Sequence, residues 1–87
     1  MKTIKVYYHS AVYGTRSAED WKVLPVADSV AEELEGRYET VEDIQKASEF
    51  LTTVTFAIER LLQLERGTDE YINVCIDRIE IVQDGAA

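Results

Sequence analysis

The chain has 87 residues, 46% of them hydrophobic, so it suits a single folded domain spanning residues 1–87. Its 17 acidic and 9 basic residues give a formal net charge of −8, which argues against direct binding of nucleic acid or of an anionic membrane. The single cysteine, Cys75, excludes an internal disulfide and favours a cytoplasmic protein.

The first element is expected to be a strand that starts near the N-terminus and ends before Gly14. Apolar residues alternate with polar ones, and many are β-branched or aromatic, which is typical of a strand with one buried face. The buried side is expected to carry Ile4, Val6, Tyr8 and Val12, and the other side Lys5, Tyr7, His9 and Tyr13. A polar loop is predicted from Gly14 to Asp20.

A second, short strand is expected from Trp21 to Val26, with Trp21 and Val23 on one face. Because proline has no N–H, Pro25 restricts this strand to an edge of the sheet. Pairing with the first strand would make a hairpin with a long connection.

Two helices are expected in the middle of the chain. The first is short, is capped by Asp28 or Ser29 and ends at Gly36. The second is long, with Thr40 as its cap and Arg66 as its last residue. At about 100° per residue its apolar side chains form one continuous arc, which leaves out Phe56. The arc contains Ile44, Ala47, Phe50, Leu51, Val54, Ala57, Ile58, Leu61, Leu62 and Leu64.

The last element is predicted to be a strand whose apolar pattern changes phase. The first phase contains Ile72, Val74 and Ile76, and the second contains Ile79 and Ile81. A bulge or bend near Asp77 and Arg78 would return all of them to one face, and two short strands are the alternative.

The elements together predict the α+β class. We expect a small antiparallel sheet of two to three strands, with one long and one short helix packed on one face.

The sequence shows no recognisable catalytic or metal-binding constellation. His9 and Cys75 both lie in expected strands, but nothing in the sequence brings them together as a nucleophile and base. Phosphate loops, calcium loops and zinc-ligand spacings are absent from it. We therefore expect a non-enzymatic protein without a metal or cofactor.

Acidic residues crowd the segment 28–43, where Arg37 is the single base. Carboxylates on a helix surface can imitate the phosphates of DNA, whereas a solvated helix face with two N-terminal turns explains the same residues. The acids are Asp28, Glu32, Glu33, Glu35, Glu39, Glu42 and Asp43.

The predicted binding residues are aromatic or positively charged and lie near the N-terminus. Tyrosine, tryptophan and arginine dominate binding hot spots, and rings left in water on a one-layer sheet indicate a covered surface. The β-propensity of tyrosine is the alternative explanation. The set is Tyr7, His9, Tyr13, Arg16 and Trp21.

These observations predict a small binding or regulatory protein that acts as a homo-oligomer on another protein. By analogy of class alone, it would be an inhibitor of the kind that phages use against bacterial defence. One alternative is a protein that sequesters a small anionic or nucleotide ligand between subunits. Another is an acidic DNA mimic that blocks a nucleic-acid-binding protein.

Overall fold

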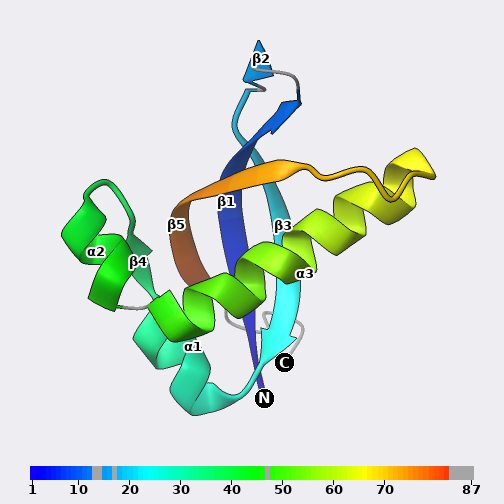
Figure 1. Cartoon of the computed structure of the whole chain (residues 1–87). Coiled ribbons are helices and arrows are strands. Elements are labelled where there is room, and N and C mark those ends of the chain that lie inside the picture. Colours follow the sequence, from blue (N-terminus) through cyan, green and yellow to red (C-terminus); the bar gives the residue numbers. More distant parts are fainter. Residues whose placement is uncertain (13–14, 17, 47, 83–87) are drawn as a thin grey trace.

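The computed structural model describes residues 1–12, 15–16, 18–46 and 48–82, without the side chains of residues 12, 15, 16, 41, 46 and 48. Within these ranges an antiparallel sheet carries helices on one face, so the α+β prediction is confirmed (Figure 1). The described strands are β1 (Lys2–Val12), β2 (Thr15–Arg16), β3 (Asp20–Val26), β4 (Gly36–Arg37) and β5 (Asn73–Val82). The described helices are α1 (Asp28–Leu34), α2 (Val41–Lys46) and α3 (Ser48–Arg66).

Strand β1 lies in the centre of the sheet and pairs with strands on both sides. β5 runs antiparallel along one side, and β3 and the two-residue β2 pair with the other. The two-residue β4 extends the sheet beyond β5. The described sheet therefore has three long strands and two short ones, whereas two to three strands were expected. Pro25 lies in the edge strand β3, as its missing N–H requires.

The alternation of β1 separates a buried face from an exposed one. Ile4, Val6 and Tyr8 are at most 1% exposed and face the helices. Tyr7 and His9 have the opposite parity and lie on the other face, as predicted. The predicted place of Val12 on the buried face concerns a side chain outside the described residues.

Strand β5 contains a bulge at the predicted change of phase. Tyr7 lies opposite Arg78 and Tyr8 opposite Ile76, so Asp77 is an extra residue in the strand. Ile76 and Ile79, on either side of this bulge, are 8% and 1% exposed. Both phases of the pattern therefore face the helices, and the alternative of two separate strands is wrong.

Helix α3 covers the sheet with a stripe narrower than the predicted arc. Its buried residues are three or four positions apart, as one helix face requires: Leu51, Val54, Ile58 and Leu62. Phe50 and Leu64, at the edge of the arc, are 36% and 63% exposed. A helix on a sheet buries its central stripe, whereas the flanks of the arc reach solvent.

The long helix predicted from Thr40 to Arg66 corresponds to α2 and α3, which lie on either side of residue 47. That residue, Ala47, lies outside the described residues. The predicted cap is confirmed, because the N–H of Asp43 donates to Oγ1 of Thr40 and the N–H of Thr40 donates to Oδ2 of Asp43, each at 3.1 Å. No helix in the described part of the chain is both long and apolar enough to cross a membrane.

Gly67 ends α3 where the sequence predicts. Its φ of 66° lies in the left-handed region that glycine adopts without strain. The N–H groups of Gly67 and Thr68 donate to the carbonyls of Leu64 and Gln63, at 3.3 and 3.0 Å. This pattern satisfies carbonyl groups that the end of the helix leaves without partners.

The predicted cap of α1 is wrong. The capping position is Ala27, which makes no side-chain hydrogen bond, and Asp28 is the first residue of the helix. The carboxylate of Asp28 instead lies 3.3 Å from the N-terminal ammonium group of Met1. This ion pair engages the carboxylate of Asp28, and α1 begins without a side-chain cap.

Tyr8 is expected to make the stability of the protein depend on pH in the alkaline range. Burial raises the pKa of Tyr8 to about 12, and the charge of Asp20, whose Oδ2 accepts a 3.4 Å hydrogen bond from the phenol, adds to the rise. The unfolded value is about 10. The contribution of Tyr8 is therefore fully present below about pH 10 and is lost between there and about pH 12.

This pKa difference corresponds to a loss on the order of 2 kcal/mol of unfolding free energy, measurable by urea denaturation at a series of pH values. Tyr8→Phe should remove this part of the pH dependence. Tyr71→Phe is the matched control, because it is the same change at a tyrosine that is 74% exposed. An unchanged alkaline profile in Tyr8→Phe would show that the phenol makes no such contribution.

Candidate functional site on the open face of the sheet

The sheet has one face against α1 and α3, and we call the opposite side the open face (Figure 1). It carries Lys5, Tyr7 and His9 of β1. The register of the sheet extends this set across the neighbouring strands. Tyr7 lies between Trp21 of β3 and Arg78 of β5, in one row across three strands.

The row is held together by contacts between rings and cations. The ammonium nitrogen of Lys5 lies 4.4 Å from the ring centre of Trp21 and 5.0 Å from that of Tyr7. The guanidinium carbon of Arg78 lies 3.8 Å from the centre of the Tyr7 ring. We call Lys5, Tyr7, Trp21 and Arg78 the aromatic–cation cluster. Contacts of this kind each contribute about 0.5–1 kcal/mol where exposed, so the cluster is pre-ordered.

Glu80 balances one cation of the cluster. Its Oε1 accepts a 2.6 Å hydrogen bond from Nη1 of Arg78, and its Oε2 accepts one of 3.3 Å from the hydroxyl of Tyr7. Lys5 differs, because no carboxylate among the described residues lies within 4.0 Å of its ammonium group.

The lysines on the helix side behave differently from Lys5. Lys2 and Lys22 lie 3.3 and 2.7 Å from carboxylate oxygens of Glu32 and Glu65. Lys5 is thus a cation held by rings and available to an anion from outside.

The apolar surface of the cluster continues along the edge strand β3. Trp21 and Val23 are each 49% exposed, although both lie in a paired strand. Pro25, the next residue of β3 on this face, is also exposed. The edge strand therefore presents a continuous apolar strip next to Lys5.

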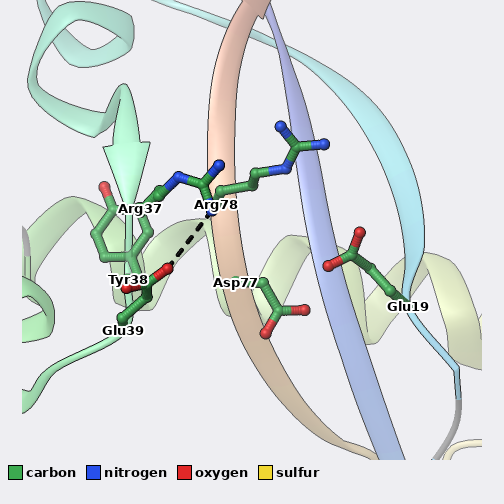
Figure 2. Close-up of a pocket in the computed structure, with 6 residues that line it drawn as sticks. All are labelled: Glu19, Arg37, Tyr38, Glu39, Asp77 and Arg78. Carbon is green, nitrogen blue, oxygen red and sulfur yellow. Dashed lines mark hydrogen bonds and ion pairs between the residues drawn. The ribbon is translucent and has the colours of Figure 1, made fainter.

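A hollow of about 660 Å³ adjoins the cluster at the bulge of β5 (Figure 2). The N–H of Tyr38 donates to the carbonyl of Asp77 at 2.9 Å, which fixes one wall of the hollow against the bulge. The charged lining contains three carboxylates and two guanidinium groups, so the hollow does not favour an anion. It is lined by Glu19, Arg37, Tyr38, Glu39, Asp77 and Arg78.

The bulge also brings Asp77 to His9. Oδ2 of Asp77 is buried and lies 2.5 Å from Nδ1 of His9, although no well-aligned hydrogen bond to this oxygen is present among the described residues. Cys75 lies directly opposite His9 in the register and is exposed. The fold thus places the two residues on one face, while Nδ1 of His9 is directed to Asp77.

The predicted site residues have three different outcomes. Tyr7, His9 and Trp21 lie together on the open face. Tyr13 lies outside the described residues. Arg16 belongs to β2, opposite Ala11, and its side chain is not described. In the described part of the chain, no group of three or more histidine, cysteine, aspartate or glutamate side chains could hold a metal ion.

Sequence reasoning missed Lys5 as a member of the site, and it considered Arg78 only as one of the arginines that would hold a small anion between subunits with the aromatic rings. Lys5 has the same parity as Tyr7, so alternation alone places the two on one face. Arg78 reaches Tyr7 only because the bulge sets the register between β1 and β5.

Several acids of the segment 28–43 have partners within the chain. Asp28 lies beside the N-terminal ammonium group, Glu32 beside Lys2, and Asp43 caps α2. Oε1 of Glu39 lies 3.5 Å from Nη1 of Arg37. These roles are local, and they explain four of the seven acids in the segment.

Comparisons of the chain with family models, curated proteins and solved structures found no match.

Proposed function

We propose that the protein is a non-enzymatic binding protein that associates with protein through its open face. The observation that carries this proposal is the aromatic–cation cluster, which spans three strands on the face opposite α1 and α3. Tryptophan, tyrosine and arginine are the residues most enriched in binding hot spots. Half-exposed Trp21 and Val23 add apolar area that a partner would remove from water.

A protein partner fits this surface better than a polyanion does. The net charge of −8 repels nucleic acid at long range, and the carboxylates of the hollow disfavour a small anion. Four of the seven acids of the segment 28–43 have local roles, which weakens the DNA-mimic alternative. An oligomeric inhibitor acting in the cytoplasm is the form of this function that we propose.

Replacing Trp21 with alanine is expected to weaken association by about 2 kcal/mol or more, the usual cost of a hot-spot residue. Tagged protein would be cross-linked in an extract of the cells that make it, and the retained proteins would be quantified by mass spectrometry. Phe56→Ala is the matched control, since Phe56 is an aromatic residue of α3 that is 63% exposed.

Proteins that need the open face should be lost from Trp21→Ala and kept by Phe56→Ala. Copies of the chain itself count among them. Equal recovery of every retained protein by the two variants would show that the open face is not the binding surface.

A further inference from the structure

Two charges on the open face, those of Lys5 and Glu19, make no ion pair with any described group of opposite sign. The ammonium group of Lys5 has no carboxylate, and the carboxylate of Glu19 no cation, within 4.0 Å among the described residues. One is positive and the other negative, so a single copy of the chain presents both halves of an ion pair.

The two charges lie on opposite sides of the Trp21–Tyr7 row. Lys5 and Val23 form the next row on one side of the Trp21–Tyr7 row. The ammonium group of Lys5 lies near the rings of both Trp21 and Tyr7. Glu19 precedes Trp21 by two residues, which places it on the other side of the row. Figure 2 shows its side chain extending over β1 toward Asp77. Both charges therefore lie along the boundary between β1 and β3.

This layout is complementary to itself. A two-fold axis that runs parallel to the Trp21–Tyr7 row, midway between two facing sheets, exchanges the two sides of the row, so each Lys5 faces Glu19 of the partner subunit. A contact of this kind requires the same patch on both copies, with opposite charges at equal distances from the axis. Sheets pack face to face at about 10 Å, a gap that lysine and glutamate side chains span together.

We infer that the open face binds a second copy of this chain, as a two-fold dimer with two ion pairs between Lys5 and Glu19 of the partner subunit. This inference rests on the proposed function, because it names the protein that the open face binds. The apolar strip of β3 and the Trp21–Tyr7 row form the centre of the contact, and the ion pairs flank it. Each subunit is 9.9 kDa, and its small core gains buried area from the contact.

The test is a charge exchange between subunits, followed by sedimentation equilibrium. Wild-type protein should sediment as a dimer. Lys5→Glu alone places two like charges at both contacts, and so does Glu19→Lys alone. Each variant should therefore raise the dissociation constant of the dimer at least about tenfold. An equimolar mixture of the two variants restores an opposite pair at both contacts, so it should recover the dimer.

The matched controls are Lys2→Glu and Glu33→Lys, which make the same changes of charge away from the open face. They should dimerise like the wild type, alone and when mixed. A variant that fails to fold, as judged by its thermal unfolding, cannot recover on mixing. Recovery therefore separates a direct contact from a loss of structure or a change of net charge.

A wild-type protein that stays monomeric at every concentration would overturn the inference. So would single variants that dimerise normally, because the contact would then lie elsewhere. A monomeric protein would also remove the oligomeric form of the proposed function. The binding of other proteins through the open face stands in either case if Trp21→Ala still loses other proteins that Phe56→Ala retains. It falls together with the inference if both variants retain the same proteins.

Discussion

Replacing Ile58 with alanine is expected to lower the free energy of unfolding by about 2–5 kcal/mol. Ile58 is fully buried, and it lies in the stripe of α3 that packs on the sheet. Truncation removes apolar contacts and leaves a cavity that a close-packed core fills only in part. A loss of this size is a large share of the stability of a small domain.

The measurement for Ile58→Ala is urea denaturation followed by circular dichroism, with the slope against denaturant compared between variants. Leu64→Ala is the control, because Leu64 lies on the same helix and is 63% exposed. Its effect should be about 0.5 kcal/mol or less. Similar losses in both variants would contradict the assignment of the buried stripe.

Replacing Ile79 with lysine is expected to destabilise the fold by about 4 kcal/mol or more, the range of substitutions that bury an unpaired charge. Ile79 is 1% exposed and lies opposite Val6, which is fully buried. The bulge at Asp77 is the reason for this burial. In a strand without this bulge, Arg78 would lie on the same buried face as Ile76, and Ile79 would lie on the open face.

The control for this change is Val82→Lys. Val82 is a β-branched residue of the same strand, but it lies on the open face opposite Thr3. Its substitution should cost about 1 kcal/mol or less, because the introduced ammonium group stays in water. The measurement is thermal unfolding of both variants. If Ile79→Lys were as stable as the wild type, the register assigned to β5 would be wrong.

The bulge was predictable because a change of phase is visible in the residues themselves. Ile76 and Ile79 differ in parity, and one buried face requires an extra residue between them. The cap of α1 was misjudged, because Asp28 is the first residue of the helix and its carboxylate pairs with the N-terminus, which is distant in sequence.

The site was also predicted only in part, because some of its contacts join residues that are distant in sequence. Tyr7 and Trp21 were recognisable by residue type and by their place in expected strands. Their direct contact with Lys5 and Arg78 depends on which residues lie opposite one another in three strands. Periodicity fixes the face of each residue, but it does not fix the register between strands that are distant in sequence.

The bulge in β5 has a consequence for how this sequence can vary. With Asp77 removed, residues 73–82 would alternate between the two faces without interruption, and the same apolar side chains would still face the helices. The sheet therefore does not need Asp77 for its core, while the contact with His9 and the lining of the hollow both use it. A loss of one codon would change the charge of the open face and leave the buried pattern intact. Evolution can thus revise what this surface recognises separately from the fold that supports it.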